Sequence, residues 1–302
     1  MGDKSTQLAI IGAGPGGYAG AFLAADLGLQ VTLIDPAANP GGVCLYRGCI
    51  PSKTLLHAAH LVQEAQNGEQ WGLTFKDLAV DVDVLRQRKD RVVAQLTEGL
   101  GQLVKRRKIT YIRGTAVFKD DKTLEIKDPG GEKSALRFEN AVIATGSLAV
   151  KLPMFAEAGD RVWDATKALD LEDVPDRLMV VGGGYIGLEL GSVWMRLGAK
   201  VTVIEMLPKI ATGLDGQVGR TLDRILRKQG MDIRVKTKVT GAKRSGKKLK
   251  VSVEQADSKE ELLFDRLLVS VGRRPLTEGL GLEDAGVDVD ERSGQVKVDT
   301  DY

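Results

Sequence analysis

Short apolar runs, each followed by a glycine-rich turn and a helical pattern, dominate two parts of this chain. Residues 8–35, LAIIGAGPGGYAGAFLAADLGLQVTLID, contain an apolar run, the turn, the helical pattern and a second apolar run ending in an acid. Residues 178–205, LMVVGGGYIGLELGSVWMRLGAKVTVIE, repeat this order and align with the first copy without a gap. An apolar run beside a helical pattern predicts a buried parallel strand and its crossover helix. The chain is therefore predicted to contain two strand–turn–helix–strand units.

The remaining pattern predicts further helices and strands around these two copies. Apolar residues at helical spacing predict a helix over 50–65 and one long helix over 82–106. Short β-rich or buried runs predict strands, some ending in tight turns, at 110–112, 116–118, 141–147, 233–238, 248–253 and 267–275. The charged run 243–250 is interpreted as a turn between two of these strands.

The repeat sets the expected domain organisation. We expect a first domain over 1–150, a second over 151–272, and a return of 273–302 to the first. Leu152-Pro153 marks the first crossing. Alternating buried strands and helices predict an α/β protein with two Rossmann-like domains.

Each copy carries a G-x-G-x-x-G motif, whose glycines have separate mechanical roles. The first makes the tight strand-to-helix turn, the second lets the backbone approach a pyrophosphate, and the third lets the helix pack close to the strand. The motif residues are Gly12, Gly14, Gly17 and the acid Asp35 in one copy, and Gly182, Gly184, Gly187 and the acid Glu205 in the other. One such motif often marks only a tight turn, so two purely structural turns are the alternative. Two full copies with their acids favour two dinucleotide sites.

Composition excludes several classes of protein. The 302 residues are 43% hydrophobic, and 43 basic against 41 acidic residues give a net charge of +2. Such a balance predicts no nucleic-acid partner. We expect no membrane association, because no apolar run approaches the roughly 18 residues that a span needs. We expect a cytoplasmic protein, because no apolar leader precedes the first strand.

The chain has only two cysteines, Cys44 and Cys49, and its only histidines, His57 and His60, lie just downstream. We predict no metal site, because two thiols are too few ligands. A disulfide closing so short a loop would stabilise little. Helical spacing would place the two Cα atoms roughly 8 Å apart, whereas a disulfide needs about 7 Å or less. Gly48 can allow the required distortion. The spacing favours a pair that cycles between disulfide and dithiol, with two unpaired core cysteines as the alternative.

Taken together, these motifs resemble the pyridine nucleotide–disulfide oxidoreductase family. The resemblance rests on the two glycine motifs, G-G-x-C-x4-G-C-I-P-S-K at 41–53, A-T-G-S at 144–147 and V-G-R-R-P at 271–275. Within the family, Ile50-Pro51-Ser52-Lys53 followed by Leu55-Leu56-His57 looks like the branch that oxidises dihydrolipoyl groups. It differs from glutathione reductase, which lacks the serine, while mercuric reductase shares Pro-Ser-Lys and stays an alternative. The resemblance implies a three-layer β/β/α form of both domains.

The resemblance also implies which residues bind which cofactor. FAD would contact Gly12, Gly14, Gly17, Asp35, Gly42, Val43, Cys44, Lys53, Ala116, Thr145 and Gly146. NAD would contact Gly182, Gly184, Tyr185, Ile186, Gly187, Glu189, Glu205, Val239 and Gly272. Glu205 favours NAD over NADP because a carboxylate repels a 2′-phosphate, and Lys209 is the only cation nearby.

The resemblance implies a catalytic set of Cys44, Cys49, Lys53 and Glu189. Cys44 would exchange with the dihydrolipoyl thiol and Cys49 would face the flavin, while Lys53 would pair with Glu189. Lying between two leucines of a buried helix, Glu189 would be costly without a partner. The alternative for Lys53 is an ordinary surface lysine without a catalytic role. Tyr185 would cover the flavin until nicotinamide enters, with ordinary packing as the alternative.

The expected partners follow from the same resemblance. They are the lipoyl domain of an E2 acyltransferase in a 2-oxo acid dehydrogenase complex, and a second copy in a homodimer. Family chains continue well past position 302 into a domain that carries a histidine–glutamate base, and we do not expect His57 or His60 to replace it. A nucleotide-binding fragment with only diaphorase-type activity is the alternative function.

Overall fold

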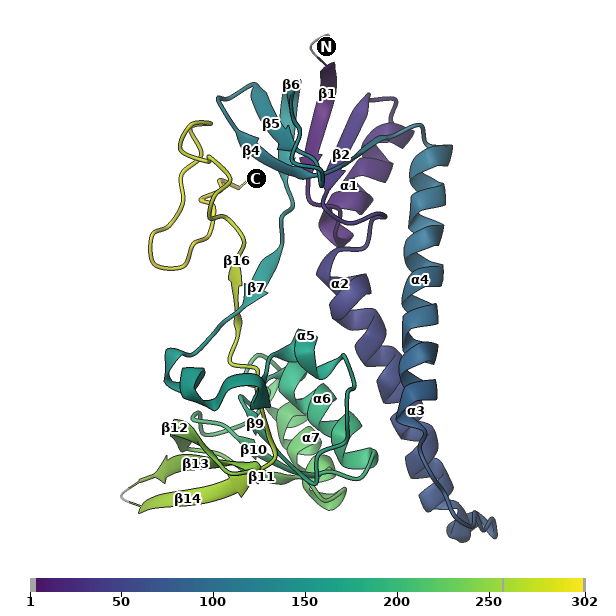
Figure 1. The fold of residues 1–302 in the computed structure, drawn as a ribbon, viewed down its shortest axis with the longest axis vertical. Helices are drawn as coiled ribbons and strands as arrows, with labels where there is room; N and C mark the ends of the chain where they lie inside the picture. The colour runs from purple at the N-terminus through teal and green to yellow at the C-terminus, as the bar shows by residue number, and fades with distance from the viewer. Residues whose placement is uncertain (1–3, 257, 301–302) are drawn as a thin grey trace. The chain divides into compact units, whose positions relative to one another are not determined.

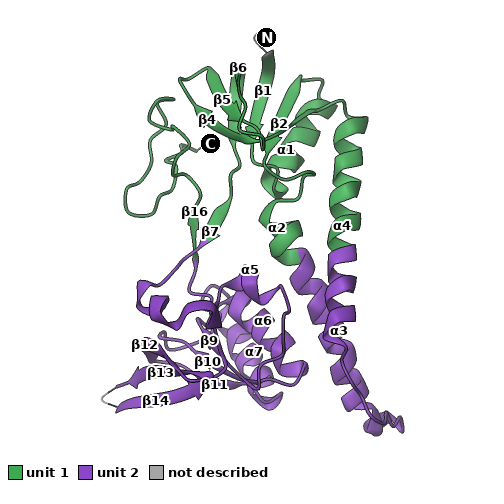
Figure 2. Ribbon diagram, in the orientation of Figure 1, with its two compact units in different colours: residues 1–49, 92–148, 273–302 green, residues 50–91, 149–272 purple. Residues whose placement is uncertain are grey.

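The computed structural model describes residues 4–256 and 258–300. The chain divides into two compact units, and each unit contains one copy of the repeated motif (Figure 2). Unit 1 comprises residues 1–49, 92–148 and 273–302, and unit 2 comprises residues 50–91 and 149–272.

Unit 1 is built on a six-stranded sheet in the order β3-β2-β1-β6-β5-β4 (Figure 1). Strands β3, β2, β1 and β6 are parallel neighbours, whereas β6, β5 and β4 form an antiparallel meander. The strands are β1 (Lys4–Ile11), β2 (Val31–Asp35), β3 (Thr110–Arg113), β4 (Thr115–Phe118), β5 (Thr123–Lys127) and β6 (Lys133–Ile143). The expected parallel pair on either side of the first glycine turn is confirmed as β1 and β2.

Successive residues of β1 point to opposite faces of the sheet and so contribute to two different core layers of unit 1. Ala9 and Ile11 belong to a core shared with the β4–β6 meander, which contributes Phe118 and Leu124. Ile10 belongs to a second core on the helical side. The helical elements are α1 (Pro15–Asp26), α2 (Gly42–Arg47) and the second part of α4 (Val82–Arg106). The three-layer β/β/α arrangement is thereby confirmed.

Unit 2 repeats this plan with a five-stranded parallel sheet in the order β11-β10-β9-β15-β8. A separate antiparallel sheet, β12-β13-β14, forms the second β layer. The strands are β8 (Val162–Trp163), β9 (Arg177–Val181), β10 (Lys200–Ile204), β11 (Asp232–Arg234), β12 (Thr237–Ser245), β13 (Lys248–Gln255), β14 (Ser258–Phe264) and β15 (Arg266–Val269). The helical elements are α5 (Ala165–Ala168), α6 (Tyr185–Arg196), α7 (Gly216–Lys228) and the 3-10 segment η2 (Pro153–Arg161). Val180 faces the helical core, and Met179 and Val181 face the β layer.

The helical segment 50–91 belongs to unit 2, because it makes most of its contacts with that unit. It contains most of α3 (Cys49–Gln66), the 3-10 turn η1 (Gly68–Trp71) and the start of α4. Leu55 on α3 is only 1% exposed and packs in the helical core of unit 2. On α4, Arg86 donates to the Leu171 carbonyl and the buried Lys89 donates to the Leu169 carbonyl at 2.8 Å. Apolar burial and these bonds fix the segment to unit 2.

The structure confirms the helices predicted over 50–65 and 82–106 and the strands predicted over 110–112, 116–118 and 248–253. It corrects the strand predicted over 233–238, because β11 ends at Arg234 and β12 begins at Thr237. The charged run 243–250 was predicted as a turn, but β12 continues to Ser245 and β13 begins at Lys248. The error arises because the last three residues of β12, 243–245, are all exposed, as the residues of a turn would be. Only in the β13 part of this run does a charged residue alternate with buried ones, as Lys250 does with Leu249 and Val251.

The runs 141–147 and 267–275, predicted as strands that end in turns, contain the ends of β6 at Ile143 and of β15 at Val269. Beyond these breaks, β7 (Ser147–Ala149) and β16 (Arg273–Pro275) pair in a two-stranded ribbon that was not predicted.

Within residues 4–256 and 258–300, none of the helices combines the length and apolar character required to cross a bilayer.

The close packing of α1 on the first turn predicts a sharp difference between two neighbouring glycines. A Cβ on Gly17 would lie 1.8 Å from the Gly12 carbonyl oxygen, whereas a Cβ on Gly16 would meet nothing within 4 Å. We expect Gly17→Ala to lower the free energy of unfolding by about 1–3 kcal/mol or more through overpacking. Gly16→Ala should raise it by up to about 1 kcal/mol, because alanine is the better helix former. Urea denaturation of both variants measures the difference, and equal stabilities would contradict the packing.

Candidate nucleotide and redox sites

The first glycine turn has the backbone geometry that a dinucleotide site requires. Gly12 has a φ of +98°, and a Cβ there would lie 2.4 Å from the Ala144 carbonyl oxygen. Gly14 is the N-cap of α1 and has no side chain to occupy the unbonded N–H groups of the first helical turn. These N–H groups and the helix dipole form a site for a phosphate.

The second turn reproduces this geometry in unit 2. Gly182 has a φ of +105°, and a Cβ on Gly187 would lie 2.4 Å from the Gly182 carbonyl oxygen. Gly184 caps α6, and a Cβ there would meet nothing within 4 Å. The space over Gly184 therefore suits close approach of a pyrophosphate. Both turns fit the phosphate part of a dinucleotide.

The acid at the end of each second strand is held by two backbone N–H groups. Asp35 accepts hydrogen bonds from Ala13 N at 2.7 Å and Ala37 N at 2.9 Å. Glu205 accepts hydrogen bonds from Gly183 N and Leu207 N, both at 2.7 Å. Each carboxylate oxygen has lone pairs left for a ribose hydroxyl. The acids thus order the glycine turns and stand at the place where the ribose is expected.

The other residues predicted to bind FAD lie around the first turn in unit 1. A Cβ on Gly42 would lie 2.5 Å from Gly14 Cα, so only glycine allows the start of α2 to approach the turn this closely. Val43 and Cys44 follow on α2, and Ala116 is buried in β4. Thr145 donates its hydroxyl to the Leu276 carbonyl at 2.7 Å, and Gly146 has a φ of +77°. Any contact of Ala116 with a cofactor would use its backbone.

The residues predicted to bind NAD lie in unit 2 with different degrees of exposure. Tyr185 begins α6 and is 70% exposed, so it does not pack in the core of unit 2. Ile186 is half-buried. Val239 is buried in the β-layer core, which leaves only its backbone for a ligand. Gly272 has a φ of +128°, and its carbonyl accepts from Val150 N at 3.1 Å.

The redox segment breaks its helix between the two cysteines. Helix α2 ends at Arg47, Gly48 has φ −149° and ψ −109°, and α3 begins at Cys49. A Cβ on Gly48 would lie 2.9 Å from the Val43 carbonyl oxygen and 3.4 Å from Cys44 Cα. The distortion expected at Gly48 is therefore confirmed. Cys44 is half-buried and Cys49 is exposed.

Tyr18 on α1 interacts electrostatically with both cysteines, and the sequence analysis did not identify it. Burial raises the pKa of its phenol, and negative charge on Cys44 and then on Cys49 raises it further. Its position directly after Gly17, in the first turn of α1, is the signal that could have identified it.

Lys53 and Glu189 meet within unit 2. The Lys53 ammonium donates to both oxygens of Glu189, at 2.7 and 2.8 Å. Their side chains are 58% and 32% exposed. The expected pairing is confirmed as a contact, while its catalytic role stays a prediction. Lys53 follows Cys49 by one turn of α3, which also carries the exposed His57 and His60.

A second set of residues that the sequence did not predict holds the loop 36–41, between Asp35 and α2. Arg113 Nε donates to the Pro36 carbonyl at 3.1 Å, and the Tyr111 hydroxyl donates to the Ala37 carbonyl at 3.0 Å. The Tyr46 hydroxyl donates to the Asn39 carbonyl at 2.9 Å. Burial, followed by the negative charge of Asp35, raises the pKa of Tyr111 well above its usual value. Long-range bonds to carbonyls leave no periodic signal in a sequence.

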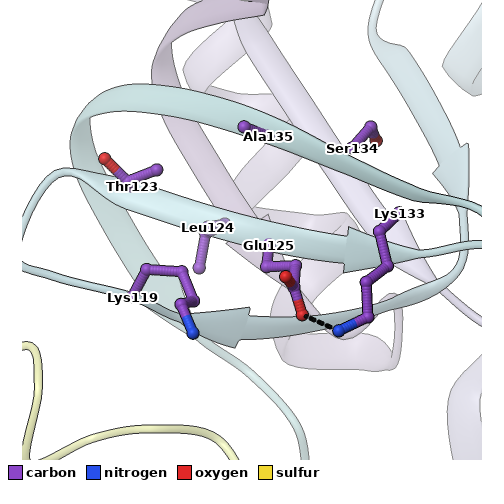
Figure 3. A pocket seen from close by; sticks show the side chains of 7 residues that line it. All are labelled: Lys119, Thr123, Leu124, Glu125, Lys133, Ser134 and Ala135. Carbon is purple, nitrogen blue, oxygen red and sulfur yellow. Dashed lines mark ion pairs between the residues drawn. The ribbon is translucent and has the colours of Figure 1, made fainter.

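A cavity of about 220 Å3 lies on the β4–β6 meander (Figure 3). It is lined by Lys119, Thr123, Leu124, Glu125, Lys133, Ser134 and Ala135. An ion pair at 2.9 Å between Lys133 and Glu125 runs along it, and none of the predicted site residues lines it. Among the described residues, no three His, Cys, Asp or Glu side chains are grouped in a way that could hold a metal ion.

Relatives of known description share this sequence along almost its whole length. A dihydrolipoyl dehydrogenase of Thermus scotoductus is 45% identical over 292 residues, which are 96% of this chain and 62% of that protein. A dihydrolipoyl dehydrogenase of Haemophilus influenzae is 40% identical over 297 residues, 98% of this chain and 62% of that protein. A leghemoglobin reductase of Glycine max is 38% identical over 293 residues, 96% of this chain and 56% of that protein. The chain spans about three-fifths of the length of these curated relatives.

A solved structure has the same fold. The HOCl-induced flavoprotein disulfide reductase RclA of Escherichia coli, determined as a Cu(II) complex, superposes with a TM-score of 0.82 at 31% identity. The match covers 99% of this chain and 63% of that chain. Residues 6–302 match the family described as pyridine nucleotide-disulphide oxidoreductase, with both glycine turns and the cysteine pair inside the matched range. This chain belongs to the pyridine nucleotide-disulphide oxidoreductase family.

Proposed function

We propose that this chain is the nucleotide-binding and redox part of an NAD-dependent flavoprotein that oxidises dihydrolipoyl groups. The observation that carries the proposal is the pair of matching glycine turns, one in each unit, with the cysteine pair beginning beside the first. The 40–45% identity to proteins named dihydrolipoyl dehydrogenase supports this substrate class. FAD is assigned to unit 1 and NAD to unit 2.

The thiol chemistry uses only the two cysteines and the substrate dithiol. One substrate thiolate attacks Cys44 Sγ in the Cys44–Cys49 disulfide, forms a mixed disulfide and releases Cys49 as a thiolate. The second substrate thiol then displaces Cys44, so the substrate leaves as a disulfide and the protein keeps two electrons as a dithiol. FAD, when bound, supplies the two-electron carrier between this dithiol and NAD.

Lys53 supplies positive charge on the helix that begins at Cys49. An ammonium near a thiolate lowers the free energy of the charged form. Glu189 accepts two hydrogen bonds from this ammonium and so limits its rotamers. The proposed role of Glu189 is to orient Lys53, and that of Lys53 is to stabilise negative charge as it develops.

Partners and location follow from the same proposal. The substrate would be the lipoyl domain of an E2 acyltransferase in a 2-oxo acid dehydrogenase complex, and the complete protein would act as a homodimer. A reactive dithiol suits a reducing compartment, which supports a cytoplasmic location. We propose neither nucleic acid nor a membrane as a partner.

The proposed function is tested by the substrates that reduce NAD. The chain loaded with FAD should form NADH from dihydrolipoamide and not from glutathione. Cys44→Ser and Cys49→Ser should each abolish this reaction, because neither can form the disulfide. Both variants should still oxidise NADH with an artificial electron acceptor, which needs the nucleotide sites alone. Turnover of the unsubstituted chain with the artificial acceptor only would favour the diaphorase alternative.

The Lys53–Glu189 pair is tested by a double-mutant cycle on the rate at which dihydrolipoamide reduces the protein disulfide. Lys53→Met should slow this step by about 100-fold, the usual effect of removing one preorganised electrostatic group. Glu189→Gln should slow it less, and the double variant should be no slower than Lys53→Met, because Glu189 acts through Lys53.

Glu172→Gln is the matched control, since Glu172 accepts from Lys167 in another exposed ion pair of unit 2. It should react at the rate of the unsubstituted chain. Fully additive effects of Lys53→Met and Glu189→Gln would show that the two side chains act independently.

A further inference from the structure

The four residues between the cysteines, 45–48, are held by contacts of three kinds. Leu45 is buried in unit 1 at 7% exposure. Gly48 packs against the Val43 carbonyl, where a Cβ would come within 2.9 Å. Tyr46 reaches out of the segment and donates its hydroxyl to the Asn39 carbonyl at 2.9 Å. The inter-cysteine segment is therefore bonded to the loop 36–41 at two points, by the backbone bond from Leu45 N to the Gly41 carbonyl at 3.2 Å and by the side-chain bond of Tyr46.

The loop 36–41 is itself fixed along its length. It begins after Asp35, which accepts from Ala37 N, and it ends at Gly41, whose N–H donates to the Ala13 carbonyl at 2.8 Å. Helix α4 supports it, because Gly101 leaves room for the Asn39 side chain. The Tyr46 ring lies over Gly41, where a Cβ would come within 3.1 Å of ring atom Cε2. Tyr46 thus bonds the inter-cysteine segment to a loop that is itself held by hydrogen bonds at both ends.

We propose that Tyr46 is a positioning residue for the cysteine pair, and that its hydrogen bond to Asn39 holds the inter-cysteine segment in a shape suited to disulfide formation. The proposal rests on the proposed function, in which Cys44 and Cys49 form a disulfide. A segment already ordered in the dithiol loses less conformational freedom when the ring closes. The hydroxyl of Tyr46 therefore favours the disulfide relative to the dithiol.

The reaction to be measured is an exchange with glutathione. The protein dithiol and one oxidised glutathione give the protein disulfide and two reduced glutathione molecules, so the electron pair and both protons pass to glutathione. The equilibrium constant is obtained from the full chain in buffers of defined glutathione ratio. Unreacted thiols are alkylated and counted by mass spectrometry.

Tyr46→Phe removes the hydroxyl and keeps the ring over Gly41. We expect it to lower the equilibrium constant for disulfide formation by about threefold to tenfold, because the dithiol then regains conformational freedom, on the order of one backbone residue, that ring closure must remove. The matched control is Tyr111→Phe, which removes the neighbouring bond to Ala37 in the same loop and keeps the bond from Tyr46 to Asn39. Its constant should stay within about twofold of that of the unsubstituted chain.

Two results would overturn the proposal. One is an unchanged constant in Tyr46→Phe, and the other is an equal fall in both variants, which would assign the effect to the loop as a whole. Failure of the proposed function gives a different result, because the unsubstituted chain would then retain both thiols even in excess oxidised glutathione. That outcome would remove the disulfide itself and the role of Tyr46 with it.

Discussion

The lack of room for a Cβ between the first and third glycines of each motif is the constraint on which this structure depends. Gly17 faces the Gly12 carbonyl and Gly187 faces the Gly182 carbonyl, so each helix packs directly on the strand that precedes it. This contact aims the uncapped helix N-terminus at the end of the sheet. It also brings the turn within reach of the acid on the next strand, which accepts from Ala13 N in one unit and from Gly183 N in the other.

The redox chemistry is attached to this frame by short connections. Gly42 touches the first turn through backbone alone, and α2 presents Cys44 two residues later. The break at Gly48 starts a new helix at Cys49, and one turn further along this helix Lys53 binds Glu189 of α6. Helix α6 of the second copy therefore serves both the second glycine turn and the lysine.

Local patterns in the sequence were sufficient to predict the two turns, the long helix over 82–106 and the cysteine pair, because each depends on neighbouring residues. The pairing of Lys53 with Glu189 was predicted only through the family resemblance and the cost of an unpaired carboxylate on α6. Bonds between distant residues were missed, among them Tyr111 to Ala37 and Lys89 to Leu169. The end of β12 was misjudged because its last three residues are all exposed, and consecutive exposed charged residues are equally typical of a turn.

The central claim is that the repeated motif builds two separate dinucleotide sites, one in each unit. Equilibrium dialysis of the purified chain with FAD and NAD, together and separately, tests this most directly. The account predicts one FAD and one NAD per chain, with the amount of either unchanged by an excess of the other. A total of one nucleotide per chain, or displacement of FAD by NAD, would contradict it.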